Sequence, residues 1–185
     1  YDRELEETIE ELLVSEESSV PWDRFGESEQ ASVLSEYREA VTAYAGQFGA
    51  DPAGVRVAVD CGTGMASVAA PQVLRALGAD VVALNAQVDG HFPARESKPT
   101  AETLTDLRAF VRDGEFDFGI GHDGDADRIV IVDSDGEVVH EDTVLAVVAG
   151  RYVRESAASD PVVVTTPNAS ARIDEHVRDS GGRIE

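Results

Sequence analysis

Residues 122–128 read HDGDADR, which places three carboxylates at alternate positions with an arginine directly behind them. Three anionic side chains this close repel one another unless a cation neutralises them. Ligands that are all oxygen suit a hard divalent cation. We therefore expect Asp123, Asp125 and Asp127 to hold a metal ion, and we expect Arg128, a planar and permanent cation, to face a phosphate.

The alternative for this heptad is a solvated acidic turn, because acids are abundant throughout the chain. Asp and Glu total 37 against 15 Lys and Arg. The flanking segments 116–120 and 129–132 are apolar and typical of short buried strands, so the acids are expected on a strand-to-strand turn. Glycines 119, 121 and 124 are expected to let the backbone turn sharply and approach a ligand. This context favours a metal loop, with His122 as a turn residue or a support for the ligands.

Calcium sensing is excluded by the same positions. An EF-hand loop also begins with alternating acids, but it needs glycine at its sixth position and a bidentate glutamate at its twelfth. Those positions hold Arg128 and Ser134. Phosphatases of the haloacid dehalogenase type also use an aspartate at the end of a strand, but their further motifs are missing.

The segment Asp60–Gly64 follows one predicted strand and precedes a helix, where glycine turns often hold phosphates. A dinucleotide site would want a third glycine where Ser67 stands and an acid where Asn85 stands. A tight structural turn is therefore favoured, and a phosphate contact stays the alternative. Cys61, the single cysteine, excludes an internal disulfide and is not favoured as a nucleophile.

A polar loop at Asp89–Arg95 is the third candidate region. His91 and Arg95 could face a substrate or a neighbouring domain. A surface loop pinned by Phe92 and Pro93 explains the same residues equally well, and the sequence leaves both possibilities open.

The elements that position these residues predict an α/β fold. Helices are expected at 2–17 and 28–48, followed by strands at 55–59, 81–84, 116–120, 129–132 and 137–140, with helices at 67–77 and 101–112. A helix at 142–153, a strand at 162–165, a helix at 171–179 and a new strand near 183 follow. We expect a three-layer α/β/α domain at 53–139 with a small mixed, mostly parallel sheet. Flanking partial domains are expected at 1–52, a helical segment that ends a preceding domain, and at 140–185, the beginning of a following α/β domain.

Composition restricts the setting and the partners. The formal net charge is -22, a single lysine is present, and the acids are spread along the chain, which favours adaptation to high salt. No basic stripe is available to bind nucleic acid, and no apolar run approaches the roughly 20 residues that cross a membrane. A reducing cytoplasm is the expected location. Tyr1 at the start suggests an excised or processed piece of a longer protein.

Three segments together, Val57–Gly64, Asp89–Pro93 and residues 122–128, resemble the α-D-phosphohexomutase superfamily, which includes phosphomannomutase, phosphoglucomutase and phosphoglucosamine mutase. The resemblance implies a four-domain isomerase that interconverts hexose 1-phosphate and hexose 6-phosphate. A phosphoserine in the first domain would exchange its phosphoryl group with the sugar through a bisphosphorylated intermediate. It implies that Asp123, Asp125 and Asp127 hold Mg2+ and that Arg128 is the catalytic residue near the phosphoryl group.

The resemblance is incomplete in this chain. No Ser-His phosphoserine loop and no glycine-glutamate sugar loop are present, so the chain is expected to carry the metal half of the site and to be inactive without the remaining domains of the same enzyme. The identity of the hexose phosphate and the oligomeric state stay open. The alternatives are a stand-alone divalent-metal module and a nucleotide-binding α/β module that uses the Gly62–Gly64 turn.

Overall fold

The computed structural model describes residues 2–15, 21–49, 51–166 and 169–185, which form two compact units divided between residues 32 and 33. The first unit contains helix α1 (Arg3–Val14), which Asp2 caps by accepting a hydrogen bond from the backbone N–H of Leu5. No residue of α1 is buried, although it carries apolar side chains at helical spacing. Its amphipathic pattern is therefore not explained by packing within its own unit.

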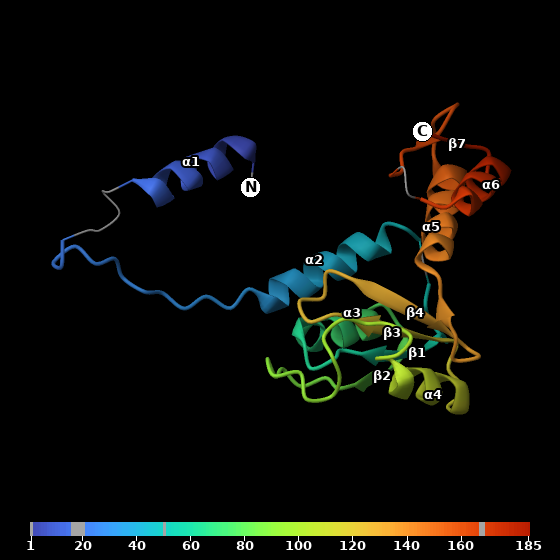
Figure 1. The fold of residues 1–185 in the computed structure, drawn as a ribbon, viewed down its shortest axis with the longest axis horizontal. Helices are drawn as coiled ribbons and strands as arrows, with labels where there is room; N and C mark the ends of the chain where they lie inside the picture. The colour runs from blue at the N-terminus through green and yellow to red at the C-terminus, as the bar shows by residue number, and fades with distance from the viewer. Residues whose placement is uncertain (1, 16–20, 50, 167–168) are drawn as a thin grey trace. The chain divides into compact units, whose positions relative to one another are not determined.

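The second unit is built on a five-stranded sheet with the order β2-β1-β3-β4-β5 (Figure 1). Its strands are β1 (Arg56–Asp60), β2 (Asp80–Leu84), β3 (Phe118–His122), β4 (Ile129–Asp133) and β5 (Val138–Val139). β1 pairs in parallel with both β2 and β3, whereas the β3-β4 and β4-β5 pairs are antiparallel. The expected mixed sheet is confirmed. It is less parallel than expected, because short turns joining β3, β4 and β5 require antiparallel neighbours.

Helices cover both faces of this sheet, which gives the expected three layers. On one face, α4 (Thr105–Asp113) buries Leu107 and Val111 against Ala58 and Val132. On the other face, the 3-10 helix η1 (Met65–Val68) and α3 (Ala70–Ala76) pack against Val57 and Val59. Alternate residues of β1 thus enter opposite cores, as the two-residue period of a strand requires.

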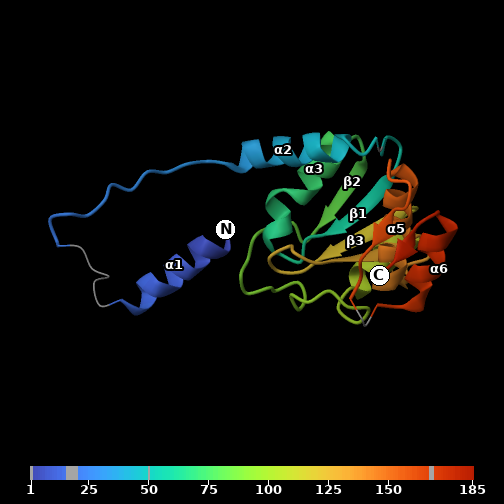
Figure 2. The same ribbon diagram turned by 90° about the horizontal axis from the view of Figure 1, so that it is seen from above.

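Helix α2 (Leu34–Gly46) lies beside α3 (Figure 2). Its Arg38 donates from Nε to the carbonyl oxygen of Val68 at 2.9 Å. This hydrogen bond fastens α2 to the end of η1. The domain limits expected at 52/53 and 139/140 stay predictions.

Several element boundaries differ from the sequence expectations for local reasons. α2 begins at Leu34 rather than near residue 28. The helix expected at 67–77 is divided into η1 and α3. Pro71 has no N–H to donate to a preceding turn, so a new helix starts here with Pro71 in its first turn, where that N–H is not needed. The helix expected from residue 101 begins at Thr105, after turns. β3 begins two residues late, because Glu115 adopts a left-handed φ of 56°.

The last elements have a core of their own. They are α5 (Glu141–Glu155), β6 (Val162–Val163), α6 (Ala171–Asp179) and β7 (Arg183–Ile184), with β6 and β7 parallel. Ala146, Ala149 and Val153 of α5 pack against Ile173 and Val177 of α6. Within the part of the chain that the structure describes, no helix is long and apolar enough to cross a membrane.

Candidate metal centre

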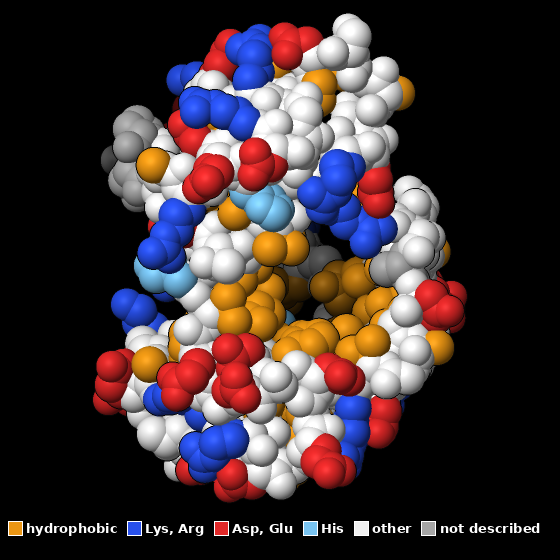
Figure 3. Space-filling model, turned by 90° about the vertical axis from the view of Figure 1, so that its right-hand side faces the viewer, with side chains coloured by type: hydrophobic (Ala, Val, Ile, Leu, Met, Phe, Trp, Pro, Cys, Tyr) orange, Lys and Arg blue, Asp and Glu red, His pale blue; other side chains and the backbone are white. Residues whose placement is uncertain are grey.

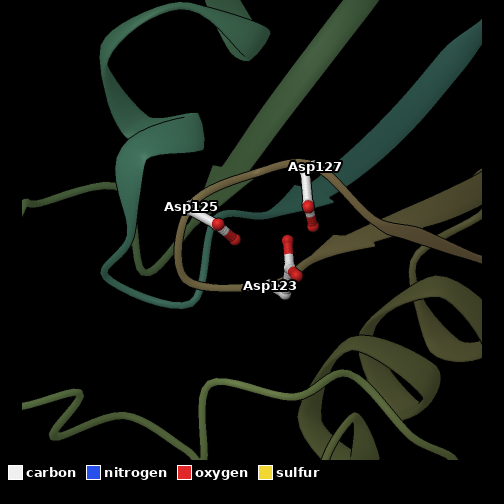
Figure 4. Close-up of side chains that lie close together, drawn as sticks. All are labelled: Asp123, Asp125 and Asp127. Atoms are coloured by element: carbon white, nitrogen blue, oxygen red, sulfur yellow. The ribbon is translucent and has the colours of Figure 1, made fainter. Parts of the chain in front are cut away.

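The three aspartates of the heptad lie on the loop that joins β3 to β4, as the sequence predicts. One carboxylate oxygen from each of Asp123, Asp125 and Asp127 lies within 4.8 Å of the other two. Figure 4 shows the three side chains directed toward one another across the loop. Asp123 is buried, while the other two are exposed, so the cluster stands at the surface with one anchored member.

The pKa values of Asp123 and Asp127 are shifted in opposite directions. Burial opposes ionisation of Asp123, but the backbone N–H of Arg128, which donates to its Oδ1 at 3.1 Å, helps hold the pKa of this carboxyl below its usual range. The pKa of Asp127 is raised, first by its hydrogen bond with Asp123 and then by the nearby charge of Asp125. The opposite directions of these two shifts show that the carboxylates of the cluster repel one another, and a bound cation would relieve this repulsion.

Arg128 lies beside the three carboxylates and leaves the cluster open to solvent. Its Nε lies 3.7 Å from Oδ2 of Asp123 and 3.5 Å from Oδ1 of Asp127. The side chain remains 69% exposed, so most of its donors are accessible to a ligand. The arginine is therefore placed to bind an anion beside the three carboxylates.

The backbone of the loop contains one unusual residue. Ala126 has a φ of 65°, in the left-handed region that costs a residue with a side chain about 1–2 kcal/mol. Its methyl group packs against the apolar cluster beneath β1 that includes Val57 and Val59. This packing helps to hold the curled conformation in which Asp125 and Asp127 face Asp123 (Figure 4).

The turn at Asp60–Gly64 supports the loop and does not form an open phosphate cradle. Gly62 and Thr63 have left-handed φ values of 54° and 59°. The N–H groups of Gly62, Thr63 and Gly64 donate to Asp60 Oδ1, the Asn85 carbonyl and the Cys61 carbonyl at 2.8, 2.9 and 2.8 Å. Because these donors are already used within the protein, the turn favours the structural interpretation over a nucleotide site.

The two candidate residues of the loop at Asp89–Arg95 differ in exposure to solvent. His91 is exposed, and its ring lies 3.0 Å from Oδ1 of Asp89. Arg95 instead turns inward, where only 6% of its side chain is exposed and its Nε lies 2.9 Å from Oδ2 of Asp60. Sequence reasoning missed this buried pair. The available signal was an aspartate at the end of a buried strand with an arginine in a later loop.

Two of the three heptad-region glycines serve helix packing rather than ligand approach, which corrects the sequence interpretation. A Cβ at Gly119 would lie 2.7 Å from Val111, and one at Gly121 would lie 2.7 Å from Leu104. Both residues belong to β3, so α4 can approach the strand closely. Only Gly124 lies in the loop, where a Cβ would lie 2.8 Å from the ring of Phe92.

Two further residues beside the site with side chains that could do chemistry are the half-buried His122 and the buried Cys61. The Nδ1 atom of His122 has no hydrogen-bond partner among the described residues, and burial lowers the pKa of this histidine. Cys61 is fully buried, and burial raises the pKa of its thiol to about 11. The thiol of Cys61 is therefore not presented to solvent as a nucleophile would be.

The donor set fits a hard divalent cation. Three carboxylate oxygens meet on one loop, no cysteine or imidazole shares the cluster among the described residues, and two of the three acids are open to solvent. Mg2+ favours such sites, since it is commonly held by a few carboxylates together with water and phosphate oxygens.

Comparison with known proteins agrees with this fold. The family model for phosphoglucomutase/phosphomannomutase, alpha/beta/alpha domain II, matches residues 35–136, more than half of the chain. The chain belongs to this family. Its fold is similar to part of a phosphoglucomutase/phosphomannomutase family protein from Burkholderia thailandensis, with a TM-score of 0.69, 27% identity and coverage of 84% of this chain and 33% of that one.

Curated relatives extend the similarity over the whole chain. A protein of Methanopyrus kandleri named "Probable phosphoglucosamine mutase" is 38% identical over 185 residues, which cover 100% of this chain and 40% of the relative. A phosphopentomutase of Thermococcus kodakarensis is 37% identical over 182 residues, 98% of this chain and 39% of the relative. The chain thus spans about two fifths of the length of these relatives.

Proposed function

We propose that this chain supplies the Mg2+ site of a phosphohexomutase that interconverts hexose 1-phosphate and hexose 6-phosphate. The observation that carries the proposal is the convergence of three carboxylate oxygens within 4.8 Å on one loop. Phosphoryl transfer depends mainly on positioning and on neutralising charge. A cation held by three acids, with an arginine beside it, supplies both requirements.

The three aspartates and the arginine of the loop each have a role in this proposal. Asp123, Asp125 and Asp127 would hold Mg2+, which when bound supplies positive charge to a phosphoryl oxygen. Arg128 would orient the same phosphoryl group through its exposed guanidinium. The phosphoserine and the sugar-binding residues would come from parts of the enzyme outside this chain. The phosphoryl group of that serine would pass to the sugar and give a bisphosphorylated sugar, which would then return its other phosphoryl group to the serine.

Exposed apolar surface supports the dependence on further domains. On α5, the side chains of Leu145, Val147, Val148 and Tyr152 are each more than two fifths exposed. A cavity of about 470 Å3 lies between α5 and the β4-β5 edge of the sheet. On the face seen in Figure 3, hydrophobic side chains gather around a hollow bordered by charged residues. Surface of this kind is usually covered by another domain or chain.

The sugar is the least determined part of the proposal. The relatives carry the names phosphoglucosamine mutase, phosphopentomutase and phosphoglucomutase/phosphomannomutase. The metal loop contacts a phosphoryl group in our proposal, and phosphoryl groups are common to all these sugars. We therefore propose a hexose phosphate as the class and expect residues outside this chain to select among them.

The test is metal binding by the wild-type protein and by Asp125→Asn, measured with Mn2+ by electron paramagnetic resonance and with Mg2+ by calorimetry. Removing one negative ligand should weaken binding by about tenfold or more. The matched control is Asp135→Asn, an exposed acid in the turn between β4 and β5, which should leave binding unchanged. Unchanged affinity in Asp125→Asn would refute the metal assignment.

Activity separates a mutase from a metal-binding module without chemistry. In the full-length protein, Asp125→Asn should abolish most conversion of glucose 1-phosphate or mannose 1-phosphate, while Asp135→Asn should retain it. Metal binding without conversion of any hexose phosphate would favour the stand-alone module. Protection from melting by adenine nucleotides, but not by Mg2+, would favour the nucleotide-binding alternative.

A further inference from the structure

We propose that Arg95 is a positioning residue for the metal loop, residues 122–128, and that the buried carboxylate of Asp60 holds Arg95 in place. The inference rests on the proposed metal site and assigns a role to a residue that does not touch the metal. Arg95 would act on the carbonyl oxygen of His122, the residue directly before Asp123.

The guanidinium of Arg95 joins three segments that are distant in sequence. Its Nε donates to Oδ2 of Asp60 at the end of β1 at 2.9 Å. One terminal nitrogen donates to the carbonyl oxygen of His122 at the end of β3 at 2.6 Å, and the other donates to the carbonyl oxygen of Glu96 at 3.0 Å. The planar fork of arginine can make these contacts at once, which a lysine ammonium on a flexible stem cannot reproduce.

Asp60 is built to receive this arginine. Its side chain is 1% exposed, and its second oxygen accepts hydrogen bonds from the Gly62 backbone at 2.8 Å and the Asn85 side chain at 3.1 Å. A buried ion pair is costly unless its remaining lone pairs are satisfied, and here they are. Asn85 adopts a left-handed φ of 50°, so the backbone at the end of β2 is strained at the residue that completes the pair.

The neighbouring backbone leaves room for the guanidinium. A Cβ at Gly62 would lie 2.6 Å from a terminal nitrogen of Arg95, so a side chain at this position would displace it. The loop that carries Arg95 also places the ring of Phe92 against Gly124 in the metal loop. Arg95 thus fixes the start of the metal loop at His122, while Phe92 contacts Gly124 within the loop.

A purely structural ion pair would need only the contact with Asp60. The contact with His122 goes further, because it restrains the peptide group that leads into the first predicted metal ligand. Groups that orient metal ligands typically change metal affinity by 10- to 100-fold when they are removed. We therefore expect Arg95 to influence metal affinity separately from its effect on folding.

The experiment compares Mn2+ affinity and melting temperature in the wild-type protein, Arg95→Lys and the double variant Asp60→Asn/Arg95→Met. Arg95→Lys should keep the charge opposite Asp60 and remain folded, yet bind Mn2+ about tenfold more weakly. The double variant carries no unpaired buried charge and should also fold with weakened binding. Arg75→Lys is the matched control, since Arg75 likewise donates to a backbone carbonyl, that of Val81, at 2.9 Å but away from the loop.

Mn2+ affinity in Arg95→Lys equal to that of wild type would overturn the proposal, and so would an equal loss in Arg75→Lys. Amide hydrogen exchange provides a readout that needs no metal. The N–H of Met65 donates to the Gly124 carbonyl and that of Arg128 donates to Asp123, so both report on the loop. Faster exchange of these two amides in Arg95→Lys supports positioning, and unchanged exchange contradicts it. If wild type binds no Mn2+, the metal assignment fails while this exchange result still judges the role of Arg95.

Discussion

Gly64 and Gly124 are packed backbone to backbone: a Cβ on Gly64 would meet the carbonyl oxygen of Gly124 at 2.5 Å. The same carbonyl accepts a hydrogen bond from the N–H of Met65 at 2.9 Å. The turn after β1 and the loop after β3 that carries the three aspartates are therefore in direct backbone contact. The two motifs are separated by some sixty residues in the sequence, and their contact needs a glycine at position 64.

Gly64→Ala should destabilise the protein and weaken metal binding. Gly64 has a φ of -95°, which alanine tolerates, so the expected cost is steric and about 1–3 kcal/mol in the free energy of unfolding. Urea unfolding measures the stability and Mn2+ titration measures the site. The control is Gly46→Ala, because Gly46 ends α2 with no atom within 4 Å of a Cβ, and it should be neutral or slightly stabilising. Equal effects at both positions would contradict the packing argument.

Gly121→Ala should loosen α4 from the sheet. A Cβ at this position would meet Leu104 at 2.7 Å in a fully buried core, and overpacking of this kind costs about 1–3 kcal/mol. The melting temperature should fall, and the near-ultraviolet circular dichroism of the unit should change. Gly90→Ala, with open space around its Cβ, is the control and should leave both unchanged. A variant at Gly121 as stable as wild type would show that Leu104 repacks freely.

Cys61 should resist alkylation in the folded protein at pH 8. Burial raises the pKa of its thiol from 9.0 to about 11, so the reactive thiolate is scarce and shielded. Iodoacetamide should modify Cys61 only under conditions that unfold the protein. Rapid modification of the native protein at pH 8 would contradict the burial.

The same pKa predicts the sign of a pH effect on stability. Because the folded state holds the thiol proton more tightly than the unfolded state, stability should decline as the pH rises above 9.0 and stop declining through this group above about 11. The difference between unfolding free energies of wild type and Cys61→Ala should follow this course. A difference that is constant over this range would be the contradicting result.

Salt should stabilise the protein strongly. The formal net charge of -22 makes the folded chain repel itself at low ionic strength, and the Debye length falls to about 3 Å in molar salt. The melting temperature should therefore rise between dilute buffer and molar KCl. Sucrose of matched osmolality is the control, because it is uncharged and cannot screen. Equal melting temperatures in dilute buffer and molar KCl would refute adaptation to high salt.

Much of the local structure could be predicted from the residues. The apolar runs at β1 and β4 lie where they were expected, and α6 occupies the expected range. The alternating acids between two apolar segments correctly predicted that Asp123, Asp125 and Asp127 would share one loop. These predictions succeed because they depend on neighbours within a few positions, where side-chain periodicity and turn residues dominate.

The alternating carboxylates and the strands around them were thus determined by the sequence itself, through short-range spacing. Only the tertiary structure decided that Arg95 turns inward to Asp60, that Gly121 admits Leu104, and that the Gly62–Gly64 turn supports the loop instead of opening to a phosphate. Each of these outcomes depends on groups distant in the chain that approach within a few ångströms after folding. The energies of these contacts arise only when the distant groups come together in the folded protein. Periodicity along the chain therefore does not predict them.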